Sequence, residues 1–220
     1  MASRTPSVAR PVVAVLVAIF TVVEDEFRVL LIQRSAAPDL GKWAIPGGGL
    51  QQDESLDSAA VRKLEEETGV TDVFLEQLYT FGDLDDHTAG GSVAVVYFAL
   101  VDHTRVRLAE RPEWQPDWFP MAELPVLALR NERVLEVARQ RITNKLEYTN
   151  AAYSLLPQFF TLTDLQGVYE SILGRRLDKR NFRRRMLAAE LLLGTNRTAK
   201  TGRHRPARLY RFASRRPVEF

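Results

Sequence analysis

The apolar positions in the first half of the chain group into runs that suit β-strands. Residues 12–23 and 27–33 are rich in β-branched side chains and flank a short acidic turn, which predicts a pair of buried strands. Residues 74–81 and 92–101 are further strand candidates, and residues 113–120 form a short strand or loop. These runs predict a sheet.

Two other segments have the period of a helix. Residues 55–68 are expected to be helical, with Gly69 suited to end the helix and an apolar face at i, i+4 spacing made by Leu56, Ala60 and Leu64. Residues 131–146 are expected to form a second helix. Strands combined with helices in this way predict an α+β sandwich.

The second half predicts a different layout of helix, turn, basic helix and hairpin. The four residues that start at Thr163 fit a capping box, and Gly174 is expected to end the helix behind it. The apolar stripe of this helix is made by Leu165, Val168, Tyr169, Ile172 and Leu173. Asp178 can cap the basic helix, and residues 191–193 and 208–212 suit a hairpin. This layout is typical of a winged helix-turn-helix.

Charge is divided unevenly between the halves. The chain is 45% hydrophobic and has a net charge of only +2. Residues 151–220 hold 15 Lys and Arg against 5 Asp and Glu, whereas residues 1–150 hold 15 against 23. This asymmetry predicts two domains with these bounds, of which the basic one faces a polyanion.

The chain contains no cysteine, which excludes disulfides and thiolate metal sites. The apolar run 12–23 is too short to span a bilayer, and acidic residues follow it rather than a cleavage site. We therefore expect a cytoplasmic protein without a membrane partner.

A glycine turn followed by an acidic helix is the strongest candidate for chemistry. The backbone can bend tightly and approach a ligand at three consecutive glycines, Gly47, Gly48 and Gly49. Carboxylates that can hold Mg²⁺ against a diphosphate come from Glu54, Glu66 and Glu67. Arg62 is expected to orient these glutamates, and Arg34 is placed to contact a phosphate. The alternative, an acidic solvated helix face, does not account for this spacing.

These residues resemble the Nudix box, G-x5-E-x7-R-E-U-x-E-E-x-G-U, in which U is aliphatic. The matching positions are Gly48, Glu54, Arg62, Leu64, Glu66, Glu67, Gly69 and Val70. Only the glutamate after the arginine is missing, because Lys63 takes its place. In the Nudix hydrolases that position supplies a metal ligand or the general base, so the resemblance implies a degenerate site.

Lys63 and Glu67 are four residues apart on a helix and can pair directly. The ammonium would neutralise a carboxylate that the metal needs, and it is a poor base near neutral pH. We expect metal binding at Glu66 and Glu67 to be weak or lost, no cofactor to be required, and hydrolysis to be slow or absent. Some relatives use another acid as the base, and Glu65 or residues 83–86 are available for that role.

The densest positive cluster lies in the second helix of the basic half. Phe182 and Met186 are expected to face the core, which leaves basic side chains for the major groove of DNA. The candidates on this helix are Lys179, Arg180, Asn181, Arg183 and Arg184, with Asn181 suited to read adenine. The candidates in the wing are Arg197, Lys200, Arg203 and Arg205. Solvated charges, RNA or an acidic protein partner are the alternatives, and double-stranded DNA is favoured.

The two halves together resemble the Nudix-related transcriptional regulators of NAD metabolism, the NrtR family. The likeness outside the box is strongest in residues 160–166 and 177–184 and extends to residues 144–149 and 205–212. It implies a Nudix α/β/α sandwich followed by a winged helix, in a homodimer that represses genes of NAD synthesis or use at a palindromic operator. It also implies ADP-ribose or a related nucleotide as the effector.

Two segments depart from that family, namely residues 83–90 and the pair Arg130-Asn131, and they leave the identity of the effector open. The runner-up interpretation is an active ADP-ribose pyrophosphatase with an accessory basic domain. A third interpretation is an RNA-binding Nudix protein.

Overall fold

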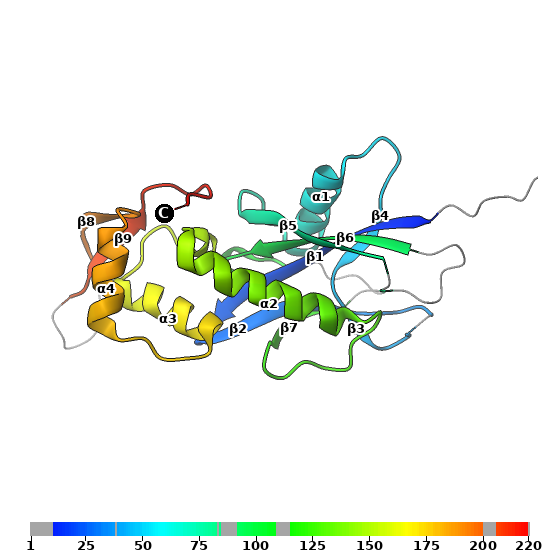
Figure 1. Ribbon diagram of the computed structural model, residues 1–220, viewed down its shortest axis with the longest axis horizontal. Coiled ribbons are helices and arrows are strands. Elements are labelled where there is room, and N and C mark those ends of the chain that lie inside the picture. The colour runs from blue at the N-terminus through cyan, green and yellow to red at the C-terminus, as the bar shows by residue number, and fades with distance from the viewer. Residues whose placement is uncertain are drawn as a thin grey trace, which may run out of the picture.

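A mixed sheet forms the centre of the larger part of the molecule (Figure 1). The computed structural model describes residues 11–37, 39–82, 84, 92–108, 115–199 and 206–219. The strands of this sheet are β1 Val12–Val23, β2 Glu26–Gln33, β3 Trp43–Ala44, β4 Gly47–Gly49, β5 Phe74–Phe81, β6 Ser92–Leu100 and β7 Gln115–Pro120. Their order is β3-β2-β1-β6-β5, while β4 also pairs with β1 and β7 with β2.

Helices cover both faces of this sheet. Side chains of β1 alternate between the faces, so each face presents apolar groups for a helix to pack against. Val15 and Ile19 pack with the buried side of α1 (Leu56–Thr68). Phe20 points to the other face, which is covered by α2 (Asn131–Tyr148) (Figure 1). The predicted α+β sandwich is confirmed, as is the pairing of its first two strands, which is antiparallel.

The three consecutive glycines form strand β4 rather than the predicted turn. They pair in antiparallel register with residues 14–16 of β1. A Cβ added at Gly47 would collide with Leu16 Cδ2 and lie 2.8 Å from the Val15 carbonyl oxygen. The close pairing of β4 with β1 therefore depends on the absence of a side chain at this position.

Gly47→Ala is expected to destabilise the fold by about 1–3 kcal/mol, the usual range for overpacking a tight site. Gly49→Ala is the matched control in the same strand, since a Cβ built there meets no atom within 4 Å. Urea denaturation measures the free energy of unfolding of both variants. Equal losses in the two variants would contradict the steric explanation.

The basic half contains the predicted helix, turn, helix and hairpin. Its elements are α3 Leu162–Leu173, α4 Lys179–Ala188 and the antiparallel strands β8 Leu192–Thr198 and β9 Arg208–Phe212. Gly174 ends α3 in a left-handed conformation and Asp178 caps α4, as predicted. The predicted cap at Thr163 is wrong, because Thr161 caps α3 and forms a capping box with Asp164.

The two halves share one hydrophobic core cluster. Tyr153, in the short turn Ala151–Ser154 after α2, packs edge-on against both Phe74 of β5 and Phe212 of β9. The Ser154 hydroxyl also accepts a hydrogen bond of 2.7 Å from the Phe74 N–H. These contacts fix α3 and α4 beside the C-terminal end of α2 (Figure 1).

Among the helices that the structure describes, none combines the length and the apolar composition of a bilayer span. The most apolar run of the first half is strand β1, which lies between β2 and β6 in the sheet.

Candidate effector site and nucleic-acid interface

Helix α1 carries Glu66 and Glu67 of the acidic cluster, and Glu54 lies just before the helix. Ser55 caps the helix through its side chain, and Gly69 ends it in a left-handed conformation. Ala60 and Leu64 are buried against the sheet. This packing leaves Glu54, Arg62 and Glu66 half-exposed, whereas Glu67 is buried.

Arg62 lies between two glutamates and binds both. Its Nε and Nη2 donate to the two carboxylate oxygens of Glu54 at 2.7 and 2.8 Å, and its Nη1 donates to Glu66 Oε1 at 3.1 Å. The hydrogen bond from Arg62 holds the pKa of Glu54 below its ordinary value, and the same bond raises the pKa of Arg62. The fork geometry suits a residue that orients carboxylates.

Lys63 pairs with Glu66 and not with Glu67, contrary to the expectation from i, i+4 spacing. Its ammonium donates to Glu66 Oε2 at 2.7 Å, while the Glu67 side chain is fully buried. Burial opposes ionisation of Glu66, but the hydrogen bonds from Lys63 and Arg62 outweigh it and lower the pKa of that carboxyl. The Lys63 side chain also lies over the glycine strand, since a Cβ at Gly48 would be 3.2 Å from Lys63 Cε.

The residues present do not fit a divalent metal at this cluster. Mg²⁺ requires available oxygen ligands, whereas cations hold both carboxylate oxygens of Glu66. Within the described ranges, no group of three or more His, Cys, Asp or Glu side chains is placed to hold a metal ion. Of the alternative bases, Glu65 is exposed on α1, and residues 83 and 85–86 lie outside the described part. The cluster is an ion-pair network in which Arg62 and Lys63 bind Glu54 and Glu66.

A cleft of about 380 Å³ opens beside the glycine strand. Arg34, Gly48 and Gly49 all line it, so the structure brings together three residues selected from the sequence. The remaining walls are mostly apolar side chains of β1, β2 and the segment before α2. A largely apolar cleft of this volume with a few polar groups is typical of a small-molecule site.

Asn131, buried at the start of α2, lines the cleft and belongs to the pair Arg130-Asn131 that departs from the family. Its Oδ1 accepts a hydrogen bond of 2.7 Å from the Ile45 N–H, and its Nδ2 donates to the Leu129 carbonyl at 3.1 Å. Leu129 and Arg130 have positive φ angles of 51° and 49°. Such backbone is uncommon outside glycine and concentrates at functional sites. The signal in the sequence was this departure at the start of the second helix, which did not by itself show that Asn131 lies at the cleft.

Helix α4 presents basic side chains on its exposed surface. Phe182 and Met186 are buried, and the exposed candidates are Lys179, Arg180, Asn181 and Arg184. Arg184 donates to Asn181 Oδ1 at 3.1 Å, so these two side chains form one polar unit. Arg183 is half-buried and reaches Thr163 of α3 at 3.3 Å.

The predicted wing is the β8–β9 hairpin. Arg197 is exposed on β8, and its guanidinium lies 4.4 Å from the centre of the Phe159 ring. The other three wing candidates, Lys200, Arg203 and Arg205, fall outside the described residues.

Arg185 of α4 makes a contact that the sequence did not predict. Its Nη2 donates to the backbone carbonyl of Glu147 at 2.6 Å. Glu147 lies in the last turn of α2. The basic helix is thereby tied to the helix whose other end reaches the cleft.

The sandwich, the box residues and the appended helix pair define a class of protein, a Nudix-type domain joined to a winged helix. The model of the NUDIX domain matches residues 12–139, and the model of the NrtR DNA-binding winged helix domain matches residues 152–212. An ADPR-responsive transcriptional repressor of Acinetobacter baylyi is 41% identical over 209 residues, or 92% of this chain and 82% of that protein. The chain belongs to the NrtR family of Nudix-related transcriptional regulators.

Two solved structures of NrtR from Shewanella oneidensis are similar to this chain. The first, in complex with a 27mer DNA, has a TM-score of 0.82 and 37% identity, and the match covers 91% of this chain and 93% of that one. The second is the NUDIX domain complexed with ADP ribose, with a TM-score of 0.53, 35% identity and coverage of 60% and 88%. The predicted combination of a Nudix sandwich and a winged helix is confirmed.

Proposed function

We propose that this chain is a DNA-binding transcriptional repressor of genes of NAD metabolism and that it senses ADP-ribose or a related nucleotide. The observation that carries the proposal is the presence, in one continuous fold, of a nucleotide-sized cleft and an exposed basic helix. The relatives support it, since one is named for its response to ADPR and another was solved with DNA. The proposed protein acts in the cytoplasm as a homodimer on a palindromic operator, because half-sites mirror two-fold symmetry.

The proposed effector domain binds its nucleotide without consuming it. Lys63 stands where the Nudix pattern has a glutamate, and its ammonium occupies one carboxylate oxygen of Glu66. This arrangement supports slow or absent hydrolysis, with no cofactor required and at most weak Mg²⁺ binding at Glu66 and Glu67. A repressor without turnover responds to the concentration of the nucleotide.

Helix α2 offers a route between the two sites. It begins at Asn131 in the cleft and ends near Glu147, whose carbonyl accepts the hydrogen bond from Arg185 of α4. Regulation requires that the nucleotide bind the DNA-free conformation better than the DNA-bound one. A small shift of α2 on nucleotide binding would displace the basic helix α4 and weaken its binding to DNA.

The deciding experiment is a mobility shift of promoter fragments from NAD genes, titrated with ADP-ribose. Specific retardation that ADP-ribose reverses is expected. Failure to shift any of these fragments would remove the regulatory assignment. Competition by RNA at matched salt concentration would favour the RNA-binding alternative, because phosphate contacts alone are salt-dependent and unspecific. Brisk hydrolysis of ADP-ribose with Mg²⁺ would favour the pyrophosphatase.

Arg34→Ala is expected to weaken ADP-ribose binding by about 10- to 100-fold, because a hydrogen bond to a charged group contributes about 1.5–3 kcal/mol. Arg34 lines the cleft, whereas Arg28 lies near the other end of β2 and pairs with Glu26. Arg28→Ala is therefore the matched control and should retain the native affinity. Isothermal titration measures both variants, and undiminished binding by Arg34→Ala would place the phosphates elsewhere.

A further inference from the structure

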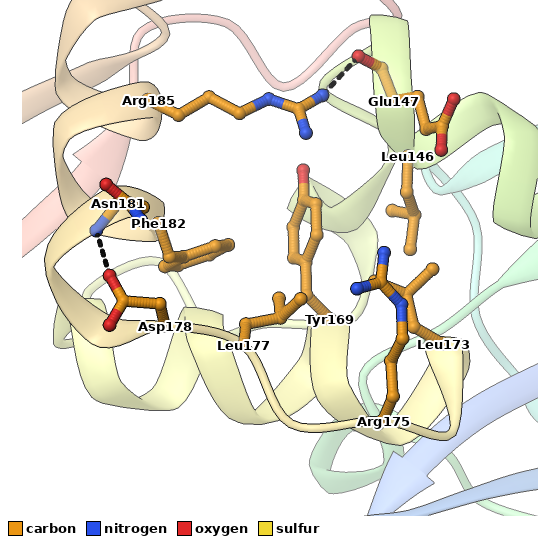
Figure 2. A pocket seen from close by; sticks show the side chains of 10 residues that line it. All are labelled: Leu146, Glu147, Tyr169, Leu173, Arg175, Leu177, Asp178, Asn181, Phe182 and Arg185. Atoms are coloured by element: carbon orange, nitrogen blue, oxygen red, sulfur yellow. Dashed lines mark hydrogen bonds between the residues drawn. The ribbon is translucent and has the colours of Figure 1, made fainter.

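A second cavity, of about 190 Å³, lies between the C-terminal end of α2 and the helices α3 and α4 (Figure 2). It is distinct from the cleft beside the glycine strand, since the two share no lining residue. Its apolar walls come from three elements and include Leu146, Leu173 and Phe182. The volume equals that of about six waters at ~30 Å³ each, enough for one six-membered ring with a small substituent.

The Tyr169 hydroxyl is a polar group that faces the inside of this cavity. Its ring packs edge-on against Phe182 with centroids 5.2 Å apart, and only 4% of the residue is exposed. The hydroxyl points into the cavity toward Arg185 (Figure 2) and makes no hydrogen bond with any described residue. Burial raises the pKa of Tyr169 to about 12, so the group is a hydrogen-bond donor at neutral pH. A ligand acceptor in the cavity would give this donor the partner that no described residue supplies.

Two guanidinium groups line the cavity, and that of Arg185 is the one next to the hydroxyl (Figure 2). Arg185 spans one side of the cavity from α4 to the Glu147 carbonyl, which engages its Nη2. Arg175, just after the end of α3, makes no ion pair or hydrogen bond with the described residues, and its guanidinium lies beside Leu173 (Figure 2).

The two acidic residues that line the cavity do not neutralise these cations. Asp178 Oδ1 accepts the hydrogen bond from the Asn181 N–H that caps α4. The Glu147 carboxylate points away from Arg185 (Figure 2), and no ion pair joins it to a described arginine. The polar side of the cavity therefore presents two cations and one hydroxyl donor to an apolar space.

We propose that this cavity is a binding site for a small monocarboxylate with a flat apolar body, of the size of benzoate. The carboxylate accepts hydrogen bonds from the Tyr169 hydroxyl and the Arg185 guanidinium, Arg175 adds a second positive charge to the cavity, and the ring contacts Leu146, Leu173 and Phe182. A carboxylate that recruits Arg185 competes with the Glu147 carbonyl for the same donor. The ligand therefore acts at the contact between α2 and the basic helix. The binding itself does not depend on the proposed response to ADP-ribose.

Titration calorimetry of the full chain with benzoate, and with benzamide as a neutral ligand of the same shape, tests the site. Saturable benzoate binding at least about tenfold tighter than that of benzamide is expected, since charge-assisted hydrogen bonds are roughly twice as strong as neutral ones. Tyr169→Phe keeps the ring packing and should lower benzoate affinity by about tenfold or more. Arg175→Gln should do the same, while Arg139→Gln, on the exposed side of α2, should have no effect.

Tyr169→Phe also provides its own control for folding. Because the hydroxyl has no partner in the described part of the chain, its removal should not lower the free energy of unfolding and should leave ADP-ribose binding unchanged. Absence of saturable benzoate binding, equal affinity for benzamide, or full affinity in Tyr169→Phe would each overturn the proposal. None of these results would bear on the nucleotide cleft, so the two proposals fail separately.

Discussion

Lys63→Glu is expected to raise the rate of Mg²⁺-dependent hydrolysis of ADP-ribose by about 10²-fold or more over the native protein. This is the lower end of the rate enhancement that a positioned acid–base group contributes. The substitution restores the acid that the Nudix pattern has at this position. It also removes the ammonium that lies 2.7 Å from Glu66 Oε2, which releases that oxygen for a metal. Product release followed with and without Mg²⁺ measures the gain.

Lys63→Gln separates the two contributions. It removes the positive charge and leaves the second oxygen of Glu66 available, but it supplies no carboxylate. We expect little or no activity from this variant, because one ligand oxygen without the missing acid does not complete the pattern. If the glutamine variant matches the glutamate variant, the cation alone blocks the site. A native protein that already hydrolyses ADP-ribose briskly would refute the assignment of a degenerate centre.

The helices and strands of this fold were predictable from the sequence where one apolar periodicity, that of a strand or that of a helix, dominates a segment. The strand pair at the N-terminus, helix α1 and the hairpin after α4 all follow from apolar periodicity with clear end signals. Strand β4 was not predictable from periodicity, because its three glycines have no side chains and so show no alternation of apolar and polar positions. Its strand geometry comes from pairing with β1, which is a tertiary interaction. The cap of α3 was misplaced for a different reason: Thr161 and Thr163 both begin a capping-type spacing, and only packing decides between them.

The candidate sites were predictable only as far as local sequence determines them. The helical positions of Arg62, Lys63 and Glu66 fixed which charges could meet, yet spacing alone did not choose between the third and the fourth residue as the partner of Lys63. The structure pairs Lys63 with Glu66. Asn131 joins the cleft because the fold brings the start of α2 to the glycine strand, and no motif marks that approach. Contacts between segments that are far apart in the sequence leave no recognisable pattern in either segment.

The double substitution Arg180→Ala/Arg184→Ala is expected to reduce affinity for an operator fragment by about 10²-fold or more, since each lost nucleic-acid contact costs about 1–3 kcal/mol. The two residues are four apart on α4 and exposed on one face. If both contact phosphates, the slope of log K against log salt should also become shallower by about 1.8, at ~0.9 per contact. Fluorescence anisotropy at several salt concentrations measures both quantities.

The expected loss of DNA affinity does not come from the lower net charge alone. A charge-matched control separates long-range attraction from direct contact. Arg105→Ala/Arg139→Ala removes two exposed arginines from outside the winged helix and lowers the net charge by the same amount. Long-range attraction would weaken DNA binding equally in both double variants, whereas direct contact from α4 confines the loss to the first. Equal losses would therefore contradict a role for α4 as the DNA-reading helix. Retained ADP-ribose binding in the α4 variant would show that the effector domain is intact and that the loss lies in the contact with DNA.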